Sequence, residues 1–229
     1  MDLPSEIGIM VLPNATLFPH TILPLYIFEP RYRAMLADAL SSHRLFSVAL
    51  QRPDRIRENP SEVAGVGIIR ASVQNKDGTS QMIVQGMTRI RLGKLIQSKP
   101  YRVHEIELFE PKCVKPEVAT ALMCKSRELV KIIFNEGLYP GAELLKKLPA
   151  SECDASINAQ ATDSYQHFLR QIERLEDPEI FVDAVGGTLL TSPAERQVLL
   201  ETPEIEERLK HLVHFLLAVI DRARNTGPK

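Results

Sequence analysis

The first half of the chain alternates short apolar runs with turn residues, a pattern typical of β-strands. We expect strands over residues 7–12, 26–28, 45–50, 62–74, 81–96 and 101–109. The segment NKDG at residues 75–78 favours a hairpin turn, because Asp-Gly adopts a positive φ at low cost. Gly65 and Gly67 lie inside a strand, where a missing side chain often marks a bulge or the close approach of another backbone segment.

Prolines dominate residues 11–32 and exclude a helix before Pro30. Pro13, Pro19 and Pro24 each remove a backbone donor and push the preceding residue toward extended conformations. Pro30 suits the first position of a helix. The apolar residues after it recur every three or four positions until about Ser42: Tyr32, Met35, Leu36, Ala39 and Leu40. We therefore expect one helix among six or so strands of a small, bent, barrel-like sheet.

The second half of the chain has helical periodicity. Apolar residues predict one helix over 118–133, stopped by Gly137 and Pro140, and a second over 157–175. Asp177-Pro178 starts a third, which we expect to end at Gly186-Gly187; the alternative is a helix that contains both glycines at about 1 kcal/mol each. Ser192-Pro193 begins a fourth helix, and Thr202-Pro203 opens the last.

Composition and charge are those of an ordinary globular protein. Hydrophobic residues make up 44% of the chain and charged residues 25%. The net charge of −1 gives no overall electrostatic attraction to nucleic acid or to an acidic membrane. The three cysteines form no Cys-x-x-Cys pair, which argues against a disulfide framework and a structural zinc site. The N-terminus has no basic region, and the apolar run at 215–220 is too short to span a bilayer. We expect a cytoplasmic protein with no membrane partner.

The motifs of nucleotide binding and hydrolysis are missing. Gly86 and Gly93-Lys94 are spaced wrongly for a phosphate loop, and Leu95 stands where that loop needs Ser or Thr. No Gly-x-Ser-x-Gly elbow occurs, although the sequence leaves open a pairing of Cys113 or Cys124 with His104. His211 and His214 are three apart and could bind a metal, but histidines on an amphipathic helix are more commonly surface residues. We expect no enzyme, no cofactor and no metal site.

The segment PNATLFPHTILPLYIFEPRYRAML at residues 13–36 strongly resembles the opening of the N-terminal substrate-recognition domain of Lon proteases. A run of fixed prolines followed by FEPRY is improbable by chance. Further segments fit the same pattern in order: Gly65-Val66-Gly67, Val84-Gln85-Gly86, Arg89-Ile90-Arg91, Leu199-Leu200-Glu201 and Glu207-Arg208-Leu209. The resemblance covers most of the chain. We expect a stand-alone form, because the ATPase and protease domains of a full Lon protease do not follow.

The resemblance implies the details of the fold. We expect an α+β protein with an N-terminal β-rich pseudo-barrel of the PUA-like kind, containing one helix, followed by a C-terminal helical bundle. The domains are predicted as residues 1–111 and 112–229, with the boundary near Pro111, where the pattern turns helical.

The function implied is a non-catalytic module that binds unfolded or tagged polypeptide, or that docks onto a proteolytic or chaperone complex. The proline-rich segment allows two interpretations. In one, Leu17, Phe18, Leu25, Tyr26 and Phe28 fill the core, and Glu29 and Arg31 cap or tether the helix. In the other, some of the segment forms an apolar rim that grips extended polypeptide. The candidate binding residues are Phe18, Pro19, His20 and Tyr26.

RNA binding is the alternative function. Residues 79–104 contain Arg89, Arg91, Lys94, Lys99 and Arg102 and no acidic residue. Arg89 and Arg91 are two apart and share one face of a strand. A solvated strand face is the default interpretation. Arg89, Arg91, Lys94 and Arg102 would instead form a face that tracks phosphates, although Tyr101 is the only aromatic residue nearby for base stacking.

Overall fold

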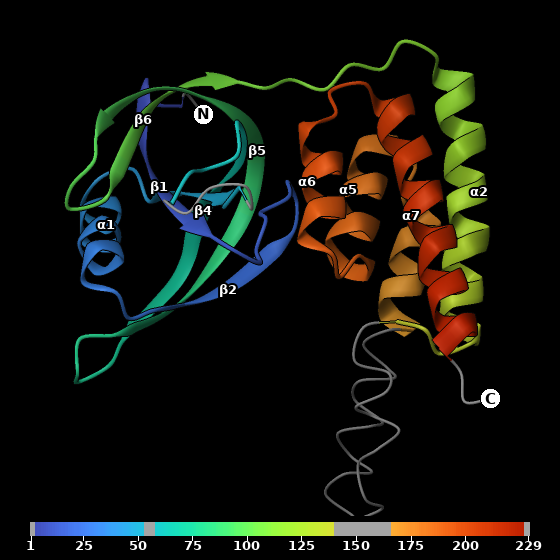
Figure 1. Cartoon of the computed structure of the whole chain (residues 1–229), viewed down its shortest axis with the longest axis horizontal. Coiled ribbons are helices and arrows are strands. Elements are labelled where there is room, and N and C mark those ends of the chain that lie inside the picture. The colour runs from blue at the N-terminus through green and yellow to red at the C-terminus, as the bar shows by residue number, and fades with distance from the viewer. Residues whose placement is uncertain (1–2, 53–57, 140–165, 227–229) are drawn as a thin grey trace, which may run out of the picture. The chain divides into compact units, whose positions relative to one another are not determined.

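The computed structural model describes residues 3–52, 58–139 and 166–226, which belong to two compact units (Figure 1). The first unit comprises Met1–Pro111 and Ser192–Pro203, and the second comprises Lys112–Thr191 and Glu204–Lys229. The first unit therefore contains the whole sheet together with one short helix from the second half of the chain.

A six-stranded sheet forms the first unit, in the order β2-β5-β4-β3-β1-β6. Its strands are β1 (Glu6–Leu12), β2 (Ile22–Ile27), β3 (Leu45–Leu50), β4 (Val63–Gln74), β5 (Ser80–Gln97) and β6 (Arg102–Leu108). Only β1 and β3 pair in parallel among these strands. The long, curved β5 also pairs with β6 (Figure 1). This pairing joins β1, β3, β4, β5 and β6 in a closed circuit and leaves β2 attached to β5 alone.

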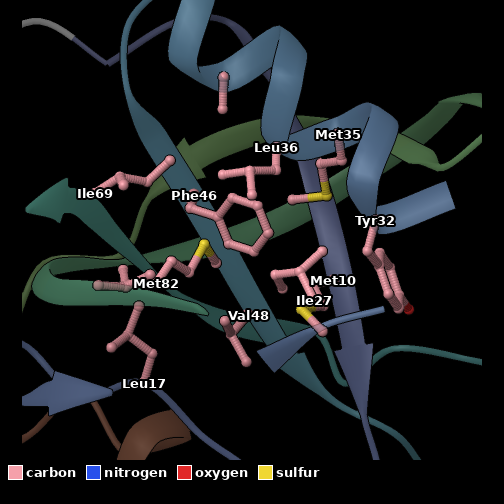
Figure 2. Packing of buried hydrophobic residues seen from close by; sticks show 12 residues of the cluster. Met10, Leu17, Ile27, Tyr32, Met35, Leu36, Phe46, Val48, Ile69 and Met82 are labelled. Carbon is pink, nitrogen blue, oxygen red and sulfur yellow. The ribbon is translucent and has the colours of Figure 1, made fainter. Parts of the chain in front are cut away.

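Helix α1 (Pro30–Ser41) packs against the apolar core of this sheet. It begins at Pro30, as predicted, and turns Tyr32, Met35 and Leu36 inward toward Phe46 (Figure 2). The same cluster includes Met10, Leu17, Ile27, Val48, Ile69 and Met82, which come from strands on several sides and from the proline-rich segment. The core is therefore assembled from residues distant in sequence, and the helix is held by its apolar stripe.

The proline-rich segment before β2 crosses directly over two strands. A Cβ built at Gly65 would lie 1.9 Å from the Leu17 carbonyl oxygen, and one at Gly86 would lie 1.9 Å from the Phe18 carbonyl oxygen. The close approach predicted at Gly65 is confirmed, and only glycine fits at such positions. Gly86 also exchanges backbone hydrogen bonds with His20 and Thr21, which fixes the entry into β2.

The second unit is helical. It contains α2 (Pro116–Asn135), a helical stretch over 166–174, α5 (Pro178–Leu189) and α7 (Ile205–Thr226), and α2 runs beside α7 (Figure 1). Helix α6 (Pro193–Glu201) groups with the first unit. The part of the predicted second helix over 157–165 lies outside the described residues. Within the described residues, every helix is too short or too polar to span a lipid bilayer.

One predicted helix end is wrong. Helix α5 does not end at Gly186-Gly187 but continues to Leu189. Phe181, Val182, Val185 and Leu189 are buried along it, so their burial offsets the propensity cost of the two glycines. Helices α5 and α6 begin at Pro178 and Pro193, as the sequence indicated, and the side chains of Asp177 and Ser192 accept from backbone N–H groups of the first turn.

Candidate functional site

Strand β2 turns one apolar face inward and another into solvent. Leu23, Leu25 and Ile27 point toward the core, whereas Ile22, Pro24 and Tyr26 alternate with them on the exposed side. Phe28 continues the exposed row after the strand ends. The Tyr26 side chain is 51% exposed and that of Phe28 is 58% exposed. A strand with apolar residues on both sides is unusual in a sheet with one solvated face, which makes the exposed row a candidate for binding.

Neighbouring strands extend this surface. The register places Ile83 of β5 between Pro24 and Ala71, and Gln81 between Tyr26 and Val73. Val73 is 66% exposed and Ile83 is 41% exposed. Pro24, Tyr26, Ala71, Val73, Gln81 and Ile83 are among the residues that line an open groove of about 590 Å³. The outer apolar face, as we call it, consists of Ile22, Pro24, Tyr26, Phe28, Val73 and Ile83.

The two aromatic rings of the face are held in place. Tyr26 and Phe28 stack with their centroids 6.0 Å apart, and the Tyr26 hydroxyl donates to Thr79 Oγ1 at 3.1 Å. Thr79 is itself fixed in the β4–β5 turn, where its hydroxyl and its N–H both donate to Asp77 Oδ1. A rigid aromatic pair loses little conformational entropy on binding, so it suits a contact surface.

The residues after Phe28 anchor the end of β2. Glu29 and Arg31 form an ion pair at 2.8 Å, and Arg31 also pairs with Glu58. The Tyr32 hydroxyl donates to Glu58 Oε1 at 2.8 Å and accepts from the Val11 N–H at 3.1 Å. Burial, followed by the hydrogen bond to Glu58, raises the pKa of Tyr32. The contacts of Glu29, Arg31 and Tyr32 therefore fix the position of the backbone that follows the exposed Phe28.

The face, rather than the free edge of β2, is the better candidate. Among the described strands β2 pairs only with β5, so one of its edges has no neighbour. Pro24 lies in the middle of that strand and supplies no N–H, and proline on an edge strand discourages the addition of another strand. Side-chain contacts across the outer apolar face do not depend on these missing donors.

Comparison with known proteins agrees with the resemblance seen in residues 13–36. The family described as the ATP-dependent protease La (LON) substrate-binding domain matches residues 6–218. The chain belongs to this family. It is similar to Lon protease 2 of Syntrophobacter fumaroxidans (25% identical over 225 residues) and Lon protease 2 of Herpetosiphon aurantiacus (28% over 220). These alignments cover 96% and 94% of this chain but 25% and 24% of the relatives, so the chain spans about a quarter of their length.

Solved structures of Lon N-terminal domains have the same fold. The domain from the Mycobacterium avium complex matches with a TM-score of 0.65 and 19% identity, covering 92% of this chain and 97% of that one. The Lon N-terminal domain protein from Xanthomonas campestris matches with a TM-score of 0.58 and 17% identity, covering 92% and 98%. The mixed architecture of a β-rich sheet and helices is therefore confirmed for this Lon substrate-binding domain.

The four residues predicted to bind polypeptide are divided by the structure. Phe18 is 1% exposed and Pro19 is buried, because the segment that carries them crosses over Gly65 and Gly86 with Phe18 turned inward. His20 is exposed with a φ of 61°, and Tyr26 belongs to the outer apolar face. The expectation that Phe18 and Pro19 form an exposed rim is therefore wrong, while the binding role of His20 and Tyr26 stays a prediction.

The assignment of Phe28 and Tyr26 to the core is also wrong. Both residues lie on the outward side of the alternation that buries Ile27. Period-two alternation over 22–28 is the signal that would have found them, but the run ILPLYIF is apolar at every position, and its two sides cannot be told apart by hydrophobicity. Val73 and Ile83 were missed because only the strand register brings them beside Tyr26.

The predicted basic face is not continuous. Arg89 is 1% exposed; it lies opposite Gly65 of β4, and its carbonyl oxygen accepts from the Phe109 N–H. The Arg102 guanidinium donates to the Glu58 carbonyl oxygen at 2.7 Å, and Arg91 lies over the Phe109 ring. Lys94 is exposed. Arg89 is thus no part of a solvated surface, contrary to expectation.

Other candidate chemistry finds little support in the described residues. No three His, Cys, Asp or Glu side chains of these residues gather where they could hold a metal ion. His211 and His214 each pack against the Phe215 ring. Burial, followed by the Glu206 carboxylate, raises the pKa of the Cys113 thiol, which disfavours the thiolate needed for nucleophilic attack. The His104 Nδ1–H donates to the Gly93 carbonyl oxygen, 3.1 Å away.

Proposed function

We propose that this Lon substrate-binding domain is a non-catalytic module that holds unfolded or tagged polypeptide on its outer apolar face. The observation that carries the proposal is the ordered Tyr26–Phe28 pair, exposed beside Val73 and Ile83 on three adjacent strands. Aromatic residues fixed in this way are the usual energetic anchors of protein interfaces. An unfolded chain exposes the apolar side chains that this face can cover.

The family supports the substrate class, and the shape of the site supports the binding mode. A groove beside Tyr26 accommodates side chains of an extended segment, and contacts through apolar groups tolerate many sequences. We further propose that residues 1–111, with which helix α6 groups, form a PUA-like pseudo-barrel that binds. The other helices of residues 112–229 form a helical bundle, and captured polypeptide is passed to a proteolytic or chaperone complex. Nothing in the placement of Arg89 and Arg102 favours RNA as the ligand.

Replacing both aromatic residues of the face tests the proposal. The double variant Tyr26→Ser/Phe28→Ser should bind a reduced, unfolded model protein about tenfold or more weakly than the wild type, because two interface anchors are lost. Leu108→Ser/Ile96→Ser is the matched control, since these exposed apolar residues lie on β6 and the far part of β5. Equal affinity of the face variant and the wild type, with both folded, would exclude the outer apolar face as the binding surface.

A further inference from the structure

One end of the outer apolar face carries an arginine that is free to meet an acidic group. Arg70 forms a bulge in β4, between the pairs Ile69–Val84 and Ala71–Ile83. Its Nε donates to Gln85 Oε1 at 2.6 Å, and Gln85 pairs with Ile22 of β2. The bulge therefore turns the guanidinium onto the outer side of the sheet, in the row that contains Ile22.

No carboxylate of the described residues lies within ion-pair distance of Arg70, whose hydrogen bond is to the neutral Gln85 side chain. A second cation lies close by, because Arg44 donates from Nη2 and Nε to the Ile69 carbonyl oxygen at 3.2 and 3.4 Å. Both arginines are exposed. The opposite end of the face, at the β4–β5 turn, holds charges of both signs in Lys76 and Asp77.

The spacing of the face matches an extended chain. Tyr26 and Val73 form one row, Pro24 and Ile83 the next, and Ile22, Gln85 and Arg70 the third, with successive rows two residues apart. Two residues of extended chain span about 6.6 Å, so alternate side chains of a bound segment face successive rows. A segment that places apolar residues over the first two rows places its next alternate residue beside Arg70.

We propose that Arg70 makes the outer apolar face selective for extended segments of the pattern apolar-x-apolar-x-carboxylate, read in either chain direction. The Arg70 Nη groups bind the carboxylate while Nε stays on Gln85, since a guanidinium has five donors and the bond to Gln85 uses one. The carboxylate comes from an Asp or Glu side chain or from the C-terminus of a polypeptide. This selectivity rests on the proposed function, because it requires polypeptide on the same face.

Matched peptides measure the selectivity directly. Short blocked peptides with two leucines at alternate positions carry Glu, Gln or Lys at the third alternate position, and a fourth carries Gln and a free C-terminal carboxylate. The Glu, Gln and Lys peptides are each made in the forward and in the reversed residue order, whereas the fourth has its carboxylate at the C-terminus and is made in one order. The wild type should bind the Glu peptide about three- to fivefold more tightly than the Gln peptide, and the Lys peptide more weakly still. The fourth peptide tells side-chain from terminal carboxylates.

Two charge variants distinguish direct binding of the carboxylate by Arg70 from a general effect of positive charge on the domain. In Arg70→Gln the preference for Glu over Gln should disappear, whereas Lys76→Gln, which removes the same charge at the other end of the face, should retain it. A preference that persists in Arg70→Gln, or equal binding of the Glu and Gln peptides to the wild type, overturns the inference and leaves the proposed function standing. If none of the peptides and no unfolded protein binds the folded wild type, the proposed function fails with it.

Discussion

The carbonyl oxygen of Phe18 lies 1.9 Å from where a Cβ on Gly86 would have to be. The proline-rich segment is thus pressed onto β5 at this point, and hydrogen bonds from Gly86 N–H to Thr21 O and from His20 N–H to Gly86 O hold it there. These contacts determine where β2 begins, and so which of its residues face solvent. A backbone contact therefore sets the position of the candidate binding surface.

Replacing Gly86 by alanine should destabilise the protein by about 1–3 kcal/mol or more, because the new methyl group can be accommodated only by moving backbone. Urea unfolding measures the loss. Gly93→Ala is the control, since its Cβ would lie 3.3 Å from the nearest atom, the Glu105 Cβ, and should cost much less. Equal stability of the two variants would mean that the segment over β5 shifts freely.

Phe18 and Phe28 should respond in opposite ways to truncation. Phe18→Ala removes a fully buried ring and should cost about 3–5 kcal/mol of stability. Phe28→Ala should change stability by about 0.5 kcal/mol or less and weaken polypeptide binding instead. Thermal unfolding together with a binding titration checks both. A large fall in melting temperature for Phe28→Ala would show that Phe28 belongs to the core and not to the outer apolar face.

The second unit contains a buried ion pair whose removal should be costly. Arg208 Nη1 lies 3.5 Å from Asp183 Oδ1, and both side chains are 0% exposed. Asp183→Ala should destabilise the protein by about 3–5 kcal/mol, because a buried guanidinium loses a counter-charge that is itself buried. The double variant Asp183→Leu/Arg208→Met should recover part of the loss in urea unfolding. If the double variant is less stable than the single one, the buried charge is not the cause.

Stability at high pH should depend on Tyr101. Burial, followed by the hydrogen bond to Asp38 Oδ2 at 2.6 Å, raises the pKa of Tyr101 to about 12. The folded state therefore keeps this proton where an unfolded chain, with a tyrosine pKa of about 10, loses it. The stabilisation is complete below about pH 10 and is lost as the pH rises toward about 12. Urea midpoints at about pH 8 and about pH 11 should converge more closely in Tyr101→Phe than in the wild type; equal losses would contradict this.

Local signals in the sequence predicted local structure well. Pro30 marks the start of α1, Gly78 takes a φ of 80° in the predicted hairpin, and Asp177-Pro178 starts α5. Each of these features depends on one or two neighbouring residues, so residue type alone predicts it. The FEPRY segment likewise predicted the family, which the match over residues 6–218 confirms.

The composition of the candidate site depended on pairing that the sequence does not encode locally. Phe28 is exposed because β2 alternates about a buried Ile27, and Arg89 is buried whereas Arg91, two residues along the same strand, is exposed. Glu58 joins Arg31 and Tyr32 across 27 and 26 residues of chain. Each of these placements follows from strand register or long-range packing, for which hydrophobic periodicity carries no signal.

Calorimetry at two salt concentrations tests the central claim, that the outer apolar face captures polypeptide. An unfolded, reduced protein without acidic segments should bind with a negative heat-capacity change and with an affinity nearly independent of salt, because apolar surface leaves water. Arg91→Gln/Lys94→Gln, which removes two exposed charges of β5, should leave that affinity within about threefold. The contradicting result is tight binding of single-stranded RNA that weakens with a slope near −0.7 per phosphate contact and collapses in this double variant, together with no binding of unfolded protein.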